Sequence, residues 1–285
     1  MNLAGRSHPY FGARAALLTQ HGKERVVAPA LREALAMELV VVRDFDTDTL
    51  GTFTRETPRF GTQIEAARRK AQIACERSGS TLGLGSEGSF GPGPFGFGSW
   101  NLEVLVLVDT ERCIEVVGSA GEPGLHHHET VTTAAQLAEA VRRAGFPEHG
   151  VVLRPDGADH PRTWKGLRTP DALEAAFHAA QQESAHGRVF VENDLRAHQH
   201  PTRMAVIARA AADLVERLAC PCPACAAPGF GRQSVVPGLP CADCGTPTEQ
   251  PIADGFGCVA CDHREVRPRT GPGAADPGSC SQCNP

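Results

Sequence analysis

The sequence lacks any long apolar run, since no stretch approaches the roughly 18 apolar residues that a membrane-spanning helix needs. No apolar segment followed by a small-residue cleavage site occurs near the start, which reads MNLAGRSHPYFGARAALLTQHGK. We therefore expect neither a signal peptide nor a membrane partner. Cysteines of a chain that is not exported stay reduced. We expect a cytoplasmic location, with thiolates available for metal ions.

The composition gives no sign of a fibrous or low-complexity chain. Hydrophobic residues make up 41% and charged residues 21% of the 285 residues, as in an ordinary globular protein. This length allows one full-sized core and a small additional domain. The sequence does not fix the oligomeric state, and a homodimer is one of the states that it allows.

Four Cys-x-x-Cys pairs, or knuckles, occupy the last 64 residues. The two-residue gap lets one tight turn aim both sulfurs at a single ion, and two such turns complete a tetrahedron. We predict a zinc ribbon domain over residues 220–285 with two structural Zn²⁺ sites, after an α/β domain over residues 1–219. The predicted zinc ligands are Cys222, Cys225, Cys241, Cys244, Cys258, Cys261, Cys280 and Cys283.

The knuckles can pair in a sequential, a nested or an interleaved order. We favour the nested order, which joins the second knuckle to the third and the first to the fourth. Cys244-Gly245 and Gly257-Cys258 flank a hairpin-like span, which agrees with that order. Cys220 and His263 lie close enough to replace a ligand, but the spacing favours both as unligated.

Concentrated positive charge is also missing. The net charge is −5, and from Cys220 onward the chain has four Arg and no Lys against six Asp and Glu. Zinc centres with four thiolates would make this tail more negative. Binding of a phosphate backbone needs clustered Lys and Arg. We expect no nucleic-acid partner, and salt-dependent retention of the isolated tail on nucleic acid would contradict this.

Before Cys220, helix-like segments alternate with buried Val- and Leu-rich strands, which predicts an α/β fold with a mixed, twisted sheet flanked by helices. Thr62-x-x-Glu65 is a capping box that opens one of the helices. The expected strands cover residues 14–19, 38–43, 81–86, 102–109, 112–119, 151–154 and 188–192. The expected helices cover residues 22–37, 62–77, 133–144, 171–184 and 202–219.

The stretch from Gly83 to Gly98 is the richest in glycine and contains a formal G-x-G-x-x-G. Because Gly and Pro continue after it, no helix can begin there, which excludes a dinucleotide-binding turn. The sequence instead predicts that the carboxylate of Glu87 lies at the end of a strand and that mobile backbone follows it. That combination suits a divalent cation and phosphate oxygens; a flexible surface loop with an incidental acid is the alternative.

The segment Thr19-Gln20-His21-Gly22-Lys23-Glu24 follows the first strand and opens the first helix. Small polar residues, an amine and a helix N-terminus suit an anion. An ordinary capped helix start with a solvated Lys23 is the alternative.

Together these pieces resemble the inosine-triphosphate-pyrophosphatase-like family of nucleotide hydrolases over about residues 13–120 and, more faintly, 195–219. Over its whole length the chain looks like members of a bacterial family named domain of unknown function 6671, a name that supplies no activity. The motifs that carry the first resemblance are a strand-Thr-polar-Lys turn ending at Lys23, Glu56-Thr57, Ala67-x-x-Lys70-Ala71, Gly85-Ser86-Glu87-Gly88, a hydrophobic strand from Trp100 to Asp109, and Thr202-Arg203.

The first resemblance implies Mg²⁺-dependent hydrolysis of a nucleoside triphosphate to pyrophosphate, with deaminated purine nucleotides among the candidate substrates. It implies Glu87 as a Mg²⁺ ligand and Lys23, Lys70 and Arg203 as phosphate-binding cations. Glu56 would be a second metal ligand or the base that orients water. Ser86 and His21 would line the nucleotide site, although His21 stands where the family usually has Asn.

Three further segments carry ligand-type residues. The run from His126 to Glu129 has metal-ligand side chains, but neighbours on an extended loop point in different directions. We expect a half-buried Trp164 rather than one stacked on a base, and inert Cys75 and Cys113 on core faces. A polar patch before the last helix either lines the cleft of the nucleotide site or is a solvated loop that caps the helix. Its residues are Glu192, Asp194, Arg196, His198 and His200.

The leading hypothesis is therefore a Mg²⁺-dependent nucleotide pyrophosphatase whose partner is a nucleotide or another phosphorylated small molecule. The alternative is a non-catalytic nucleotide- or protein-binding module whose ribbon docks a partner. The first hypothesis requires that the predicted acids and cations gather around one site.

Overall fold

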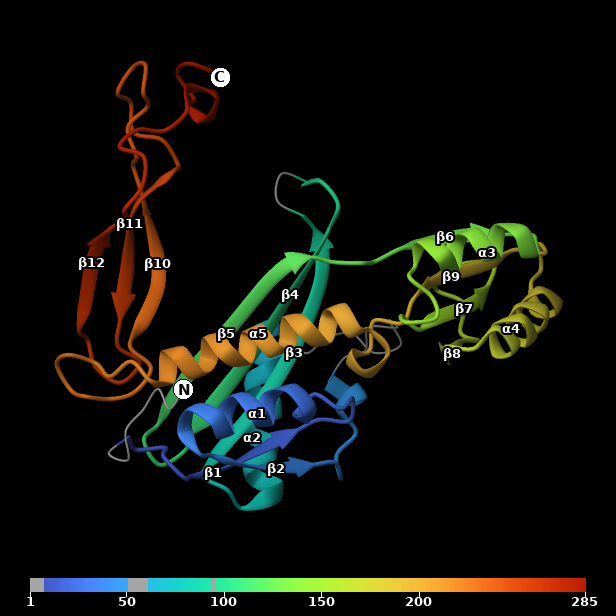
Figure 1. The fold of residues 1–285 in the computed structure, drawn as a ribbon, viewed down its shortest axis with the longest axis horizontal. Helices are drawn as coiled ribbons and strands as arrows, with labels where there is room; N and C mark the ends of the chain where they lie inside the picture. The colour runs from blue at the N-terminus through green and yellow to red at the C-terminus, as the bar shows by residue number, and fades with distance from the viewer. Residues whose placement is uncertain (1–7, 51–60, 94–95) are drawn as a thin grey trace. The chain divides into compact units, whose positions relative to one another are not determined.

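The computed structural model describes residues 8–50, 61–93 and 96–285, and its contacts form two compact units (Figure 1). The second unit holds Glu216–Pro285 together with the short segment Cys113–Val116, and the first unit holds the other residues. No helix in the described ranges has both the length and the apolar character to cross a bilayer. The cytoplasmic location stays a prediction.

A mixed five-stranded sheet with the order β2-β1-β3-β4-β5 forms the first half of the first unit. β1 runs parallel to β2 and β3, whereas β3 and β4 are antiparallel. The predicted mixed α/β class is thereby confirmed. Its strands are β1 Arg14–Leu18, β2 Glu38–Val42, β3 Leu82–Pro92, β4 Ser99–Asp109 and β5 Ile114–Pro123.

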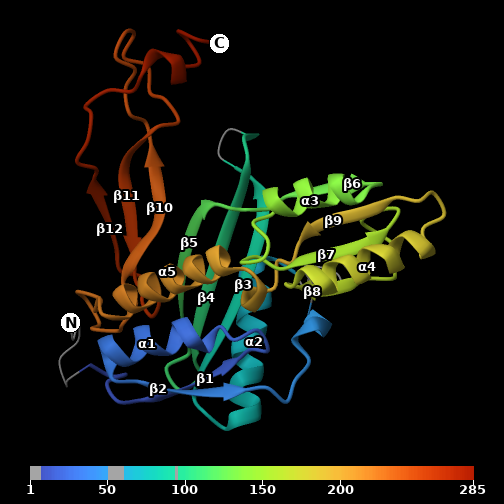
Figure 2. The same cartoon turned by 45° about the vertical axis from the view of Figure 1, so that its right-hand side comes forward.

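Helices cover both faces of this sheet. α1 (Glu24–Leu35) connects β1 to β2, and α2 (Gln63–Ser78) connects β2 to β3. Right-handed crossovers in opposite directions along a sheet place their helices on opposite faces. α5 (Pro201–Leu218) crosses the same face as α1 (Figure 2). One face therefore receives side chains from α1 and α5, and the other from α2.

The start and end of α2 follow from its sequence. Thr62 and Glu65 form the predicted capping box, in which each side chain accepts a hydrogen bond from the other residue's backbone N–H. The helix ends at Gly79, whose φ of 69° lies in the left-handed region that glycine adopts without strain. The capping box is confirmed, and the helix begins within one residue of the predicted position.

The glycines of β3 do not form a mobile loop, and the expectation that Glu87 ends a strand is wrong. β3 pairs with β4 without interruption from Leu82 to Pro92. A Cβ at Gly83 would lie 2.0 Å from the Ala71 carbonyl oxygen, and one at Gly85 would lie 1.9 Å from the corresponding atom of Ala67. These glycines therefore allow the α2 backbone to touch the strand, which is a packing role.

The second half of the first unit forms a sheet of its own with the order β6-β9-β7-β8, and its neighbouring strands pair antiparallel. The expectation of a single sheet was wrong here because β6 and β8 are four-residue, half-exposed strands without an apolar pattern. α3 and α4 pack onto its Val- and Leu-rich core. The elements are β6 His128–Val131, α3 Ala134–Arg143, β7 Val151–Pro155, β8 Trp164–Leu167, α4 Pro170–Glu183 and β9 Val189–Asn193.

The second unit contains a three-stranded antiparallel meander with the order β10-β11-β12. One small core cluster of this unit consists of Phe230 and the cysteines Cys222 and Cys258, with Phe256 packed against them. So small a core needs additional cross-links to be stable. The strands are β10 Gly231–Pro237, β11 Pro251–Gly257 and β12 Arg264–Pro268.

Candidate functional site

Eight cysteine sulfurs of the second unit form two groups of four, and within each group the sulfurs lie within 4.8 Å of one another. Sulfurs of different knuckles lie 3.6 Å (Cys225 to Cys258, and Cys244 to Cys280) and 3.8 Å (Cys241 to Cys283) apart. A tetrahedron with zinc–sulfur bonds of 2.3 Å has edges of about 3.8 Å. The residues therefore fit two Zn²⁺ ions, as predicted.

The pairing of the knuckles is interleaved, so the favoured nested order was wrong. One group joins the first knuckle to the third, and the other joins the second to the fourth. Each strand of the meander carries the chain roughly 15–23 Å, at about 3.3 Å per residue, to the opposite end of the sheet. The first and third knuckles therefore meet at one end, and the second and fourth at the other.

Local turns shape the knuckles. After the first two knuckles the chain adopts a left-handed conformation, at Ala226 with φ of 60° and at Gly245 with φ of 73°. Cys220 and His263 belong to neither group of ligand atoms. His263 instead lies 3.0 Å from Glu265.

Zinc stoichiometry tests the interleaved pairing. We expect Cys222→Ser to lose one Zn²⁺, and Cys222→Ser/Cys258→Ser to keep the other, because both cysteines belong to one site. Cys222→Ser/Cys280→Ser should lose both ions. Metal analysis of the purified variants measures this, with Cys220→Ser as the control that keeps two. A nested pairing would exchange the results of the two double variants.

A second candidate site lies at the carboxyl end of β1. There β3 extends beyond its pairing with β1, and we call this part of β3 the strand edge. In the described part of the chain, β1 pairs with β3 no further than Leu17 and Leu84. Beyond that point two side chains bind the strand's backbone. Lys23 donates to the Ser86 carbonyl oxygen at 3.3 Å, and Gln63 donates to that of Glu87 at 3.0 Å. Carboxyl ends of parallel strands are where α/β sheets bind ligands.

Two buried ion pairs flank this strand edge from opposite faces of the sheet. Lys70, on α2, lies 2.5 Å from Glu87, and Arg203, on α5, lies 2.6 Å from Glu103. Gly88 and Glu103 are cross-strand partners, so Glu103 projects from the face opposite to Glu87. Burial raises the pKa of Glu87, but the charges of Lys70 and Lys23 outweigh it and hold that pKa below its usual value.

Lys23 lies between the two pairs and is almost fully buried. It also donates to the Ser86 hydroxyl at 3.2 Å. Among the described residues, no carboxylate lies within ion-pair distance of its ammonium group. Burial, followed by the nearby Arg203 charge, lowers the pKa of Lys23 to about 7. A buried amine without a counter-ion is a binding group for an anion.

The remaining predicted residues differ in outcome. Ser86 contacts Lys23, as described above. His21 does not contact the ion pairs directly; its ring stacks on that of His198, with centroids 5.1 Å apart. Burial and the charge of Lys23 lower the pKa of His21 to about 3, so its ring is neutral. Glu56 lies outside the described residues.

Sequence reasoning missed Glu103, the fully buried partner of Arg203. The available signal was a lone acid within the apolar run of β4. Gly88 makes room for this pair, because a Cβ there would lie 2.2 Å from a Glu103 carboxylate oxygen and 2.5 Å from an Arg203 nitrogen. Glycine at this position therefore has a role at the site.

The histidine run, Trp164 and the two cysteines of the first unit have separate outcomes. The run from His126 to Glu129 is not among the groups of metal-ligand atoms in the described chain. Trp164 is half-buried against the core of the second sheet, as expected. Cys75 is buried, whereas Cys113 is exposed, so its predicted place on a core face was wrong. It sits in the β4–β5 turn with φ of 55°.

The polar patch before α5 divides into two parts. Asp194 is buried and holds Arg196 through a bond of 2.9 Å to its Nε, and it also accepts from the Gly166 N–H at 2.9 Å. His200 accepts from the Arg203 backbone N–H at 3.2 Å, at the start of α5. Asp194 and His200 therefore shape the loop and the helix start, and Arg196 keeps its guanidinium half-exposed.

Comparison with known families now adds to this geometry. A family model described as Domain of unknown function (DUF6671) matches residues 70–285. The chain belongs to the DUF6671 family. The matched region contains Lys70, Glu87, Glu103 and Arg203 as well as the predicted zinc ligands, whereas Lys23 precedes it. Neither a curated protein nor a solved structure matches the chain significantly.

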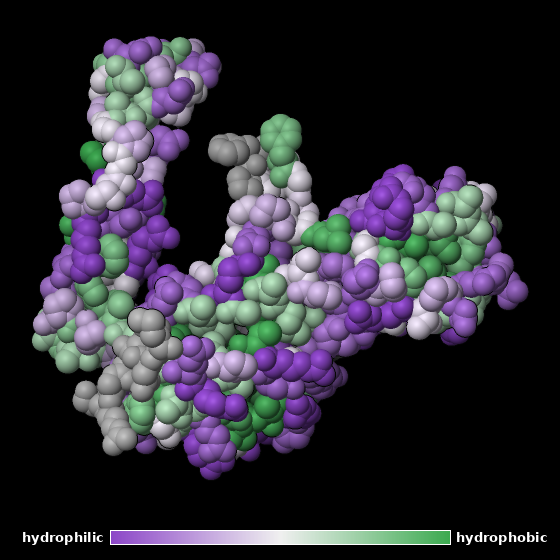
Figure 3. All heavy atoms as spheres, in the orientation of Figure 1, coloured by the Kyte–Doolittle hydropathy of each residue, from purple (hydrophilic) through white to green (hydrophobic). Residues whose placement is uncertain are grey.

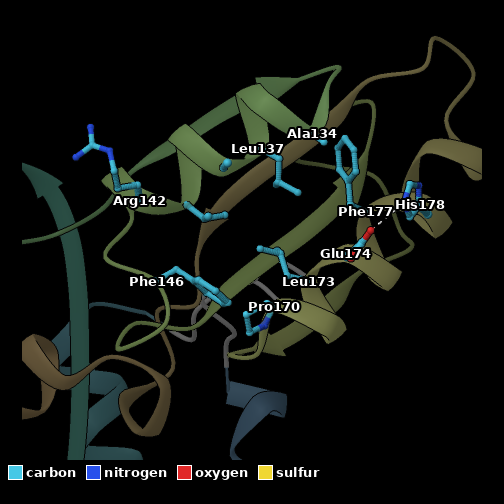
Figure 4. A pocket seen from close by; sticks show the side chains of 11 residues that line it. Ala134, Leu137, Arg142, Phe146, Pro170, Leu173, Glu174, Phe177 and His178 are labelled. Atoms are coloured by element: carbon cyan, nitrogen blue, oxygen red, sulfur yellow. Dashed lines mark ion pairs between the residues drawn. The ribbon is translucent and has the colours of Figure 1, made fainter.

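A cavity of this DUF6671 chain lies apart from both candidate sites. It has a volume of about 430 Å³ between α3 and α4, and Figure 4 shows Leu137, Leu173 and Phe177 projecting into it. Apolar residues reach the surface of the part that carries these helices (Figure 3). The lining lacks a buried cation, and none of the predicted site residues belongs to it. The strand edge therefore remains the candidate site for an anion.

The unpaired Lys23 leads to a stability prediction for the DUF6671 chain. We expect Lys23→Met to raise the free energy of unfolding by about 1–3 kcal/mol at neutral pH, because a buried amine is replaced by an apolar group. The folded pKa of about 7 lies below the ordinary 10.5, so the folded chain holds fewer protons between these values. The stability of the wild type therefore rises with pH in this window, and the advantage of the variant shrinks.

Denaturant unfolding at pH 6 and pH 9 measures this effect. Lys70→Met is the matched control, because it leaves the carboxylate of Glu87 buried without its partner and should destabilise the fold. Equal losses of stability in both variants would show that Lys23 has a counter-ion in the folded chain.

Proposed function

We propose that the chain hydrolyses nucleoside triphosphates to nucleoside monophosphate and pyrophosphate. The observation that carries this proposal is the buried ammonium group of Lys23, which has no carboxylate partner in the described chain and stands between two buried ion pairs. A triphosphate would supply the missing negative charge. The same motifs resemble the inosine-triphosphate-pyrophosphatase-like family. This resemblance supports a nucleotide as the molecule to which the triphosphate belongs.

The proposed roles follow from the positions of the side chains. Lys23 binds a phosphate oxygen at the open edge of β3, and Ser86 holds its amine in place. Arg203 is the cation on the α5 side of the site, and Glu103 orients its guanidinium. Fixed cations in a site with little water stabilise the charge that develops on phosphate oxygens during attack by water.

The proposal includes a Mg²⁺ ion with one protein ligand among the described residues. Mg²⁺ usually binds one or two protein carboxylates together with substrate phosphates. Glu87 would be the protein ligand, and Lys70, at 2.5 Å, fixes its position. A bound Mg²⁺ would neutralise phosphate charge and help to orient the attacking water.

Turnover of purified, zinc-loaded protein tests the proposal. We expect pyrophosphate release from one or more of a panel of ordinary and deaminated purine triphosphates in the presence of Mg²⁺. Glu87→Gln should lower kcat at least about 100-fold, since loss of one oriented charged group in a catalytic site has effects of that size. Arg142→Gln, which changes an exposed side chain of α3, is the control with unchanged activity.

One outcome would contradict hydrolysis, and another would contradict its place at the strand edge. Tight nucleotide binding without pyrophosphate release would indicate the non-catalytic binding module instead. Turnover that persists in Glu87→Gln would place the chemistry away from the strand edge.

A further inference from the structure

The cavity between α3 and α4 belongs to neither candidate site and has the size of a small-molecule site. Its volume of about 430 Å³ lies within the range of roughly 300–1,000 Å³ that is typical of ligand pockets. Four buried core residues of the second sheet's layer line it, namely Leu137, Val141, Leu173 and Phe177. Because these side chains are packed in the core, the cavity has a fixed apolar floor.

The cavity is elongated, because its lining follows both helices. On α3 the lining runs from Ala134 to Arg142, and on α4 it runs from Pro170 to His178. Figure 4 shows Ala134 and His178 toward one end and Pro170 toward the other. Eight residues of helix rise about 12 Å, so the cavity extends about that far along the helices. A linear apolar chain suits this shape.

One end of the cavity has a cation beside it. Arg168 donates to the carbonyl oxygens of Pro147 (3.3 Å) and Glu148 (2.8 Å). Pro147 directly follows Phe146, which lines the same end as Pro170, so these bonds hold the guanidinium next to that end. In the part of the chain that the structure describes, no carboxylate pairs with Arg168.

The charged residues of the lining itself are already paired. Arg142 lies 2.7 Å from Glu139, so its charge is balanced on its own helix. Glu174 lies 3.8 Å from His178, on the α4 side of the cavity. The charge that lacks a partner among the described residues is therefore the one beside Phe146 and Pro170, and it favours an anionic group at that end.

We propose that this cavity binds a free fatty acid of medium chain length. The alkyl chain lies between α3 and α4, and the carboxylate pairs with Arg168 at the Phe146 end. Transfer of the alkyl chain from water to the apolar floor provides the affinity, and Arg168 sets the orientation. The site is independent of nucleotide hydrolysis, because none of the strand-edge residues lines the cavity.

Titration calorimetry with the full, zinc-loaded chain tests this site with decanoate, octanoate and decanol. We expect one saturable decanoate site per chain, and affinity should fall about fourfold for each methylene group removed from the acid. Arg168→Gln should weaken decanoate binding about tenfold, the usual effect of losing a hydrogen bond to a charged group. Decanol has no charge, so its affinity should change less than twofold.

Two further pairs of variants locate the site. Ala138 is exposed and lines the cavity, so Ala138→Trp should fill it and abolish binding of decanoate and decanol. Ala135→Trp is the matched control, because Ala135 is an exposed alanine of the same helix outside this lining. Arg69→Gln removes one positive charge from α2 and is the control for Arg168→Gln.

The result that overturns the proposal differs for its two parts. If the wild type binds no decanoate, or if Ala138→Trp and Ala135→Trp bind it equally well, the cavity is not a fatty-acid site. If Arg168→Gln weakens decanoate and decanol equally, or weakens neither, the carboxylate does not pair with Arg168 and the fatty acid is refuted as the ligand. Neither result depends on whether the chain hydrolyses nucleotides.

Discussion

Removal of zinc is expected to unfold residues 220–285 while the α/β part keeps its structure. The described core of the second unit is built around its own ligand cysteines, with Phe230 as the main additional side chain. Apparent binding free energies of structural zinc are about 10–16 kcal/mol per ion, more than so small a core provides. Circular dichroism and limited proteolysis before and after chelation measure the loss.

Variants that lose one of the two Zn²⁺ ions test this expectation further. Because the two sites lie at opposite ends of the same meander, loss of one ion should expose to protease the end of β10 that this ion holds. Cys220→Ser keeps both sites and should behave as the wild type. A tail that stayed compact and resistant to protease without metal would overturn this account.

Replacement of Arg203 by methionine should destabilise the first unit by about 3–5 kcal/mol, the usual effect of breaking a buried ion pair. Arg203 and Glu103 are 1% and 0% exposed, so the remaining carboxylate would lack both water and a partner. Arg203 also donates to the Leu195 carbonyl oxygen, which would lose that bond. Denaturant unfolding followed by the fluorescence of Trp100 and Trp164 measures the shift.

Two further variants separate stability from binding. Arg203→Met/Glu103→Gln should recover part of the loss, because a neutral amide replaces the buried charge. Arg154→Met breaks the buried pair with Glu192 in the second sheet, where side-chain exposures are 1% and 7%. It should destabilise to a similar degree but leave phosphate binding intact. Equal phosphate affinity in Arg154→Met and Arg203→Met would remove Arg203 from the site.

Much of the first half of the fold was predictable because its signals are local. The capping box at Thr62, the glycine that ends α2 and the apolar strands around β1 all report on neighbours within a few residues. Metal-ligand spacing is equally local, so the eight cysteines could be identified as ligands. Each of these predictions needed no knowledge of which distant segments meet.

The errors concern contacts between distant segments. The knuckle pairing depends on which end of a three-stranded meander each turn occupies, and spacing alone does not contain that information. The glycines of β3 look like a loop in the sequence. The α2 backbone, which can touch β3 only because these residues lack side chains, is more than ten residues away. Glu103 escaped notice because its partner Arg203 is 100 residues further on.

The backbone contact at Gly83 and Gly85 has a consequence for the reach of Lys70. Ala67 and Ala71, whose carbonyl oxygens touch the strand, bracket Lys70 on α2. The position of the Lys70 amine along β3 is thus set by direct contact between the backbones of α2 and β3. No layer of side chains that could be compressed lies between them. Repacking of the core elsewhere would leave this spacing unaltered, whereas a single added methyl group on the strand would lift the helix and carry the amine away from Glu87.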